Sequence, residues 1–241
     1  MAFENGEWIM CGLDWDDPYR IRTWQELINW VKEVGFLPFF ANGVPGFSAE
    51  EHVSPLFWWT GDPEQDPWIW REIIAGSHEV AYGKFFNKRA GFISPAWLPY
   101  FANYRRDGYD FDARFDDGLA SLRDKSLYDV AAERGSLSSK ELKVLAGYGK
   151  GGEKGFDGRV TRLQMQTYLL ISDFVYALDR YGREYGWGIA CYATPEHRFG
   201  EDWLAEAYRE DPARSKERVY AHLQGLFPEA SEKQLRRLLG D

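Results

Sequence analysis

The sequence lacks the features of membrane-spanning and secreted proteins. It has no run of about 18 apolar residues, so we expect no membrane-spanning segment. The N-terminal stretch MAFENGEWIM has no basic region followed by an apolar one, so no signal peptide is visible. Cys11 and Cys191 are the only cysteines, too few for a disulfide framework. These absences together predict a reduced, cytoplasmic setting.

Motifs for metal, nucleotide and covalent chemistry are also missing. The four histidines are scattered, without HxxxH or CxxC spacing, so we expect no metal site. There is no G-x-S-x-G, and neither cysteine has a histidine close to it in sequence. The glycine-rich stretch GYGKGGEKGFDG lacks the Gly-Lys-Ser/Thr of a phosphate loop. We interpret it as a mobile loop whose Lys150 and Lys154 can meet an anion.

Positive charge is scarce overall and unevenly distributed. The net charge of −9 argues against a protein that coats DNA generally, because such binding depends on phosphate neutralisation. Residues 48–79 contain seven acidic side chains and one basic side chain. Residues 123–162 contain nine basic and six acidic side chains. The second half therefore permits contact with a nucleic acid without requiring it.

Aromatic residues are abundant, at 17% of the chain, and are densest in FWWTGDPEQDPWIWRE, residues 57–72. One interpretation is that these aromatics build the core and pack helices. The other is that they wall a pocket for a planar ligand such as a base, with a neighbouring carboxylate as general acid or base. The candidate wall consists of Trp58, Trp59, Trp68 and Trp70. The candidate carboxylates are Asp62, Glu64 and Asp66.

Helix starts are well marked in the sequence. Capping-box spacing occurs at Thr23–Glu26, Ser48–Glu51, Ser138–Glu141 and Ser231–Gln234. Asp66 followed by Pro67 predicts another N-cap. Two β-like runs that meet at Asn87–Lys88 predict a hairpin.

The order of expected elements from about residue 121 predicts a winged helix. Helices are expected in 121–135, 137–147 and 159–172, followed by two strands that flank RYGREYG at 180–186. The predicted fold class is α+β, mainly helical with short β-hairpins, in tandem winged-helix-like subdomains. The expected boundaries are 1–120 for an N-terminal winged-helix-like subdomain, 121–200 for a second winged-helix subdomain, and 201–241 for a helical extension.

The third helix of this second subdomain carries candidate nucleic-acid contacts. Arg159 and Arg162 lie on its first turns, where phosphate contacts are expected. Gln164 and Gln166 are two residues apart and so point about 200° apart on a helix. They are interpreted either as polar surface or as base-reading side chains.

Several stretches together resemble a known family. The stretches EVAYGKFFNKRAGFISPAWLPYF, LSSKELKVLAG, GRVTRLQMQTYLLISDFVYAL and WGIACYATPEH are similar to the AlkZ-related branch of the AlkZ/YcaQ winged-helix proteins. The founders of that group are DNA glycosylases that remove bulky alkylated bases and unhook interstrand crosslinks. The resemblance runs from about residue 21 to the C-terminus. It implies tandem winged-helix subdomains around a DNA-binding channel, with no metal or organic cofactor.

The resemblance also implies a catalytic motif that this chain lacks. The family's glycosylases carry Gln-x-Gln or Gln-x-Asp after the first helix, where the pair positions the attacking water. The matching region here, GFLPFFANGVPGF, contains no glutamine, and the only Gln-x-Gln is Gln164 and Gln166.

The sequence therefore predicts a nucleic-acid-associated protein, with DNA, including damaged duplex, as its partner. DNA glycosylase activity is one hypothesis, with Asp62, Glu64, Asp66, Gln164 or Gln166 as the polar group. The alternatives are a winged-helix module that binds DNA or a protein without catalysis, and a small-molecule binder that uses the aromatic pocket. The expected phosphate contacts are Lys143, Lys150, Lys154, Arg159 and Arg162.

Overall fold

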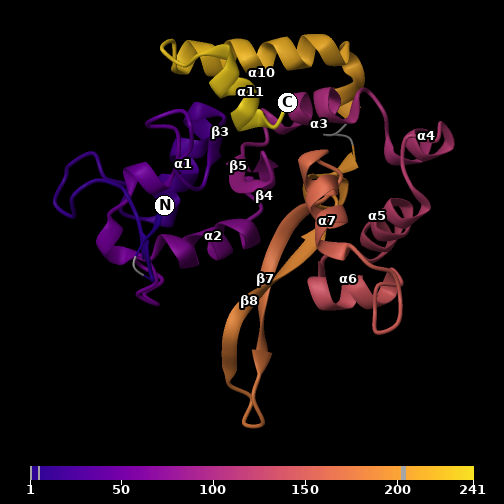
Figure 1. Cartoon of the computed structure of the whole chain (residues 1–241), viewed down its shortest axis with the longest axis horizontal. Coiled ribbons are helices and arrows are strands. Elements are labelled where there is room, and N and C mark those ends of the chain that lie inside the picture. Colours follow the sequence, from indigo (N-terminus) through magenta and orange to yellow (C-terminus); the bar gives the residue numbers. More distant parts are fainter. Residues whose placement is uncertain (1, 5, 202–204) are drawn as a thin grey trace. The chain divides into compact units, whose positions relative to one another are not determined.

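The computed structural model describes residues 2–4, 6–201 and 205–241, and the chain forms two compact units (Figure 1). The first unit contains Met1–Leu98 and Glu217–Asp241, and the second contains Pro99–Lys216. Helix α3 (Leu98–Arg106) thus groups with the second unit, although the sequence placed it in the first subdomain. Within that unit, the Asn103 amide donates to Glu210 O and to Ser215 Oγ, both at 2.9 Å.

The first unit combines helices with short antiparallel strands, and its last two helices come from the C-terminal segment of the chain. Its elements before residue 98 are β1 (Ala2–Glu4), β2 (Glu7–Ile9), α1 (Trp24–Val34), β3 (Phe36–Pro38), the 3-10 turns η1 (Glu50–His52) and η2 (Pro55–Phe57), α2 (Pro67–Gly76), β4 (Ala81–Phe86) and β5 (Arg89–Ile93). Its last two helices are α10 (Pro212–Leu226), which begins in the second unit, and α11 (Glu232–Leu239).

Local sequence signals explain where these elements begin and turn. The Thr23 hydroxyl accepts from the Glu26 N–H, and α1 ends at Gly35 with φ of 87°. A side chain at Gly35 would meet the Trp97 ring at 2.6 Å, so both the backbone and the packing require glycine. The predicted hairpin at Asn87–Lys88 is confirmed: both residues have positive φ, 48° and 65°, as a tight type I′ turn demands.

The core of the first unit forms between α1 and the three strands β3, β5 and β4. Leu27, Ile28 and Val31 of α1 are buried, as is all of β3. The C-terminal helices complete this core. His222 stacks on Trp97 with centroids 4.1 Å apart, and its Nε2 lies 2.8 Å from Val34 O. Phe227 packs on Phe47 at 4.8 Å.

The second unit consists of helices and a long hairpin. After α3 come α4 (Phe111–Asp116), α5 (Leu122–Arg134), β6 (Leu137–Ser138), α6 (Ser139–Leu145), α7 (Phe156–Met165), β7 (Leu170–Leu178), β8 (Glu184–Ala193), α8 (Pro195–Phe199) and the 3-10 turn η3 (Glu206–Arg209). Three helices and a hairpin are present after residue 121, as predicted, but the third helix ends at Met165 rather than at residue 172, because β7 begins at Leu170. Ser121 and Ser138 each form a reciprocal capping box, so α5 and α6 begin where their side chains satisfy backbone N–H groups.

The two units share one order of elements. In each, a helix precedes a short strand, helical turns and a further helix follow, and a β-hairpin comes last. In each, the first strand pairs with the last strand of the hairpin, giving the orders β3-β5-β4 and β6-β8-β7. The predicted α+β class with antiparallel hairpins is therefore confirmed, and a topological repeat is present that leaves no fixed period in the sequence.

Candidate nucleic-acid interface

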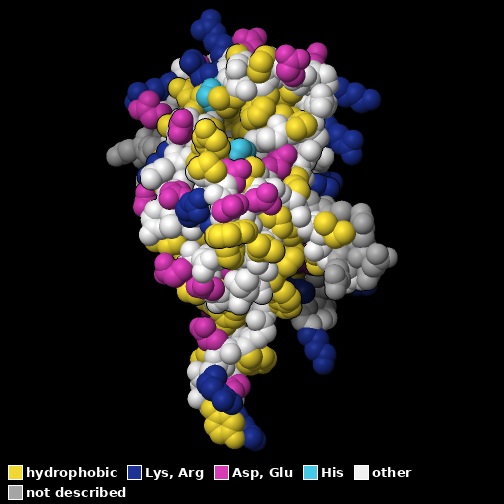
Figure 2. Space-filling model, turned by 90° about the vertical axis from the view of Figure 1, so that its left-hand side faces the viewer, with side chains coloured by type: hydrophobic (Ala, Val, Ile, Leu, Met, Phe, Trp, Pro, Cys, Tyr) yellow, Lys and Arg dark blue, Asp and Glu magenta, His cyan; other side chains and the backbone are white. Residues whose placement is uncertain are grey.

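The β7–β8 hairpin is the most exposed apolar feature of the second unit. Its strands extend well away from α5, α6 and α7 in Figure 1. Side chains that a soluble core would normally bury are largely exposed here: Leu178 at 62%, Tyr181 at 66%, Tyr185 at 58% and Trp187 at 74%. Figure 2 shows hydrophobic and basic side chains gathered at the hairpin tip, which points downward in both views. A contiguous exposed apolar surface of this kind marks an interaction site.

The tip of this hairpin is held in one shape by Asp179. Its carboxylate accepts from the backbone N–H groups of Tyr181, at 2.7 Å, and Arg183, at 3.0 Å, and from Arg183 Nε at 3.1 Å. These donors, led by the Arg183 N–H, lower the pKa of Asp179. Two guanidinium groups lie close to the ring of Tyr181, with Arg180 Cζ at 4.7 Å and Arg183 Cζ at 5.1 Å from its centroid. The fixed turn therefore presents an aromatic ring flanked by positive charge.

A second candidate contact feature surrounds the start of α7. A hollow of about 490 Å³ is lined there by two lysines, Lys143 and Lys154, and by two acidic residues, Glu153 and Asp157. Glu153 is paired with Arg123, 2.8 Å away. The Lys143 ammonium lies 5.8 Å from the Phe156 ring centroid. Within the described part of the chain, Lys143, Lys150 and Lys154 make no ion pair. The structure thus brings Lys143 and Lys154 together, and Lys150 lies exposed in the loop that leads to them.

Arg159 and Arg162 converge, but on a carboxylate of the same unit. Arg159 Nη1 lies 3.1 Å and Arg162 Nη2 lies 2.5 Å from the same oxygen, Asp124 Oδ1. Burial alone would raise the pKa of Asp124, but hydrogen bonds from Ser121 and the two guanidinium groups outweigh it and lower the pKa. Arg162 remains 49% exposed, whereas Arg159 is only 20% exposed. The negative charge of Asp124 therefore offsets part of the positive charge of the two arginines that were predicted to contact phosphates.

The two glutamines of RLQMQT do not share a site. Gln164 lies inside α7 and is fully buried, with its amide donating to Val160 O one turn earlier. Gln166 is the C-cap of that helix and is half-buried. The helix holds them on different sides, as the helical spacing predicted.

The acidic turn between the tryptophans contains one buried carboxylate and two more accessible ones. Asp66 is 1% exposed, and its side chain accepts from three backbone N–H groups: Trp59 at 3.1 Å, Gly61 at 3.0 Å and Trp68 at 2.9 Å. It therefore caps α2 and shapes the turn. Asp62 is half-buried and accepts from the Glu64 N–H at 3.0 Å, while Glu64 is exposed.

The four tryptophans predicted to wall a pocket also differ in how far they are exposed. Trp70 is fully buried and donates from its indole to Pro63 O at 3.1 Å. Trp58, 6% exposed, stacks on Phe40 at 5.9 Å. Trp68 is half-buried beneath the Arg71 guanidinium, 3.7 Å from its ring centroid. Trp59 differs, because it is 38% exposed and has a positive φ of 60°.

The region where the resemblance implies a catalytic glutamine pair is apolar in this chain. Phe36, Leu37 and Phe39 are fully buried there. The only polar side chain in residues 35–47 is Asn42, whose amide is used within the loop, accepting from Val44 N at 2.9 Å and donating to Phe47 O at 2.7 Å.

Sequence reasoning did not identify the exposed rings of the β7–β8 hairpin. The available signal was RYGREYGW, in which aromatic and basic residues alternate through a turn. Side chains in such a turn have no core against which to pack. In the described ranges, no three His, Cys, Asp or Glu side chains come together as a metal site would require. Of the helices described, none has the length and apolar character needed to cross a bilayer.

Comparison with known proteins identifies the family. No curated protein matches the chain. Among solved structures, the chain is similar to the DNA glycosylase AlkZ of Streptomyces sahachiroi, with 11% identity and a TM-score of 0.46. That alignment covers 92% of this chain but 60% of the other, so the chain spans less than two thirds of that glycosylase. The sequence model of the family described as AlkZ related matches residues 21–240. Because this match extends over nearly the whole sequence, the protein belongs to the AlkZ-related family.

Proposed function

We propose that the protein binds duplex DNA through its second unit, with the start of α7 and the β7–β8 hairpin as the contact surface. The observation that carries this proposal is the hairpin tip, where the Tyr181 ring has the Arg180 and Arg183 guanidinium groups beside it on an exposed turn that Asp179 holds by hydrogen bonds. The order α5, β6, α6, α7 and hairpin supports the assignment of this unit as a helix-turn-helix variant with a β wing. Membership of the AlkZ-related family supports the same partner.

The chemistry of the two features is complementary. Lys143, Lys150 and Lys154 supply ammonium groups that can neutralise phosphates, and each such contact releases condensed counterions. The tip supplies a ring and guanidinium groups, which can stack on a base or enter a groove. Because the chain has a net charge of −9, long-range attraction to DNA is weak. Affinity therefore depends on these local groups.

The test is fluorescence anisotropy of a labelled duplex at several salt concentrations. We expect salt-dependent binding by the wild type. In the triple variant Arg180→Gln, Lys150→Gln, Lys154→Gln, the slope of log K against log salt should fall by about 2–3, roughly 0.9 for each phosphate that is no longer neutralised. Arg134→Gln is a matched control, since Arg134 is exposed on α5 and is already 3.6 Å from Glu133. Absence of salt-dependent binding by the wild type at about 50 mM salt would overturn the proposal.

Removal of a damaged base is a second candidate function, favoured by Trp59. A bulky residue with φ of 60° is strained, and such strain persists where surrounding contacts hold it, often at functional sites. Here the Trp59 N–H is held by Asp66 at 3.1 Å while the ring remains partly exposed. The more accessible carboxylates, Asp62 and Glu64, follow within the same turn. A flipped base stacked on Trp59 would then have a carboxylate beside it to orient the attacking water.

An abasic-site release assay on alkylated duplex DNA tests this second candidate. Release by the wild type that disappears in Asp62→Asn or Glu64→Gln, with DNA affinity unchanged, is the expected result. Glu79→Gln is the control, because Glu79 is exposed and paired with Lys32. If the wild type releases no base, the catalytic candidate is wrong and the DNA-binding proposal remains.

A further inference from the structure

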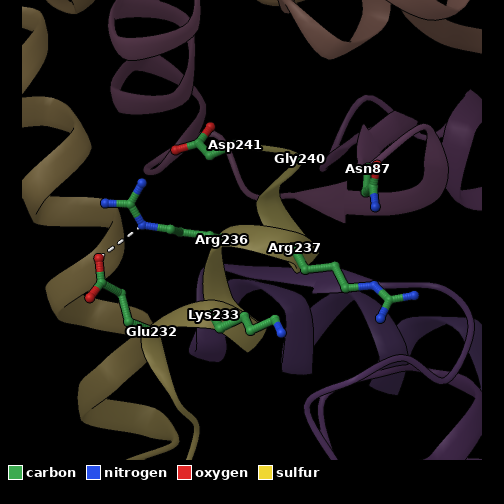
Figure 3. Close-up of a pocket in the computed structure, with 7 residues that line it drawn as sticks. All are labelled: Asn87, Glu232, Lys233, Arg236, Arg237, Gly240 and Asp241. Atoms are coloured by element: carbon green, nitrogen blue, oxygen red, sulfur yellow. Dashed lines mark hydrogen bonds and ion pairs between the residues drawn. The ribbon is translucent and has the colours of Figure 1, made fainter.

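A basic groove lies on the first unit, between α11 and the turn that joins β4 to β5. Two hollows of about 540 and 430 Å³ adjoin there and share Asn87 and Arg237 among their lining residues. Figure 3 shows the residues that line the larger one. Each is within the size range of small-ligand sites. The smaller one is lined by two arginines, Arg89 and Arg237, and by no acidic residue.

The cations of this groove are not neutralised by the protein. Among the described residues, Arg89, Lys233 and Arg237 make no ion pair and no side-chain hydrogen bond. Arg236 is different, because its Nε lies 2.8 Å from Glu232 Oε1. In Figure 3 the side chains of Lys233 and Arg237 extend toward one side, and that of Arg236 extends the other way, toward Glu232. The unpaired charge is therefore concentrated on one side of α11.

The two acidic residues of the larger hollow are already engaged. Glu232 holds Arg236, and the Asp241 side chain accepts from the Tyr220 hydroxyl at 2.7 Å. The side of the groove that holds Lys233 and Arg237 therefore retains an excess of donors. Asn87 adds an exposed amide there, which makes no hydrogen bond with other described residues.

The walls of the groove are fixed in place. Gln234 Nε2 donates to Gly43 O at 2.7 Å, which ties α11 to the loop before Phe47. Ser231 and Gln234 form a reciprocal capping box that fixes the start of α11. Phe86 and Leu238 lie at the base, 1% and 6% exposed. A rigid frame lowers the entropic cost of holding several donors around one ligand.

The position of the groove in the topology is a separate argument for a ligand. The β4–β5 hairpin is the first unit's counterpart of β7–β8, since each follows the last helix of the shared order of elements. Its tip carries Lys88 and Arg89, as the tip of β7–β8 carries Arg180 and Arg183. Both hairpins thus present basic groups at equivalent places.

We propose that this groove binds a phosphate group, with the Arg237 and Arg89 guanidinium groups as its main donors and Lys233 and Asn87 beside them. Guanidinium groups suit phosphate because their paired N–H groups match two phosphate oxygens. The phosphate belongs either to a DNA phosphodiester, in which case the inference rests on the proposed function, or to a free phosphate or monoester, in which case it stands alone.

The experiment has two arms with the same proteins: wild type, the double variant Arg89→Gln, Arg237→Gln, and the control Arg134→Gln, whose exposed side chain lies outside the groove. In the first arm, the salt dependence of duplex binding is measured by anisotropy. In the second, inorganic phosphate replaces chloride at constant ionic strength while the arginine Nε–Hε signals are followed by NMR. Unfolding midpoints in urea verify that each variant is folded.

A salt slope lowered by about 1–2 in the double variant, and unchanged in Arg134→Gln, assigns the groove to a DNA phosphodiester. An unchanged slope with a saturable phosphate-dependent shift of the Arg237 signal assigns it to a free phosphate group. If neither effect occurs, the inference is overturned while DNA binding through the second unit stands. If the wild type fails to bind DNA, the proposed function is wrong, and the NMR arm alone decides whether the groove binds a phosphate group.

Discussion

Arg106, which is buried, and Glu196, which is half-buried, form an ion pair across 90 residues of the chain, with Nη1 and Oε1 2.8 Å apart. The Arg106 side chain is 1% exposed and also donates to Tyr208 Oη at 2.9 Å and Thr167 O at 2.6 Å. Burial by itself would lower the pKa of Arg106, but Glu196 and Tyr208 outweigh it, so the pKa lies above its ordinary value. This pair joins α3, α8 and the segment after α7 in the second unit.

Arg106→Met is expected to destabilise the protein by about 3–5 kcal/mol, because it leaves the Glu196 carboxylate without its partner. The free energy of unfolding, measured in urea, checks this. Arg106→Met combined with Glu196→Gln should recover part of the loss. Arg134→Met, on an exposed ion pair, should change stability by less than about 1 kcal/mol. Equal losses at the two arginines would contradict this account of Arg106.

Asp124→Asn is expected to weaken the fold at neutral pH by about 1–3 kcal/mol, because the carboxylate accepts from Ser121, Arg159 and Arg162. A carboxyl whose pKa is lowered by folding stabilises the native state above its unfolded pKa of about 4. That contribution disappears as the pH falls through the lower folded value. The difference between wild type and variant should therefore shrink below about pH 4.

The same substitution frees two guanidinium groups, so Asp124→Asn should bind DNA more tightly than the wild type despite its lower stability. Asp129→Asn is the control, because Asp129 is exposed and pairs with Lys125 one turn away. Unfolding curves at several pH values and anisotropy at one salt concentration provide both readouts. A constant stability difference down to about pH 2 would contradict the assigned role of Asp124.

Tyr185→Ser on the β7–β8 hairpin is expected to lower DNA affinity about 5- to 150-fold, the equivalent of the roughly 1–3 kcal/mol that stacking on a base contributes. The free energy of unfolding should change little, because the ring is 58% exposed. Tyr19→Ser, at a site 85% exposed in the first unit, is the matched control and should leave the affinity unchanged. Equal affinity of Tyr185→Ser and wild type would remove this ring from the interface.

The two free cysteines are expected to react with a thiol reagent such as DTNB at very different rates. Burial raises the pKa of Cys191 to about 11, so at pH 8 only about one molecule in a thousand carries the thiolate. Burial and then Glu50 raise the pKa of Cys11, but Cys11 is exposed. One fast and one slow phase should appear, and Cys11→Ser should abolish the fast one. Two equally fast phases in the folded protein would contradict this prediction.

Most elements of the fold could be predicted because their signals are local. Thr23, Ser138 and Ser231 each satisfy N–H groups within three residues, so sequence spacing alone identifies the caps. The Asn87–Lys88 turn depends only on its own two residues and the strands beside it. The grouping into units was not predictable in this way, because it depends on contacts such as Asn103 with Ser215, 112 residues apart.

The candidate site was less predictable, because composition does not reveal exposure. Trp70 and Tyr185 are both aromatic residues in aromatic-rich stretches, yet one is fully buried and the other 58% exposed. Asp66 and Asp62 lie in one turn, but only the N-cap geometry shows that Asp66 is occupied by backbone donors. The charge pairing of Arg159 with Asp124 likewise depends on how α7 packs on α5.

The discontinuity of the first unit has a practical meaning for dissecting the protein. A fragment that stops at Leu98 would leave Trp97 without the imidazole of His222 and Phe47 without the ring of Phe227. Residues 99–216, by contrast, form an uninterrupted stretch. The half that carries the long hairpin can therefore be expressed as one segment, provided that it extends to Leu226, because a cut at Lys216 falls within α10. The other half requires its two segments to be expressed together or joined by a linker.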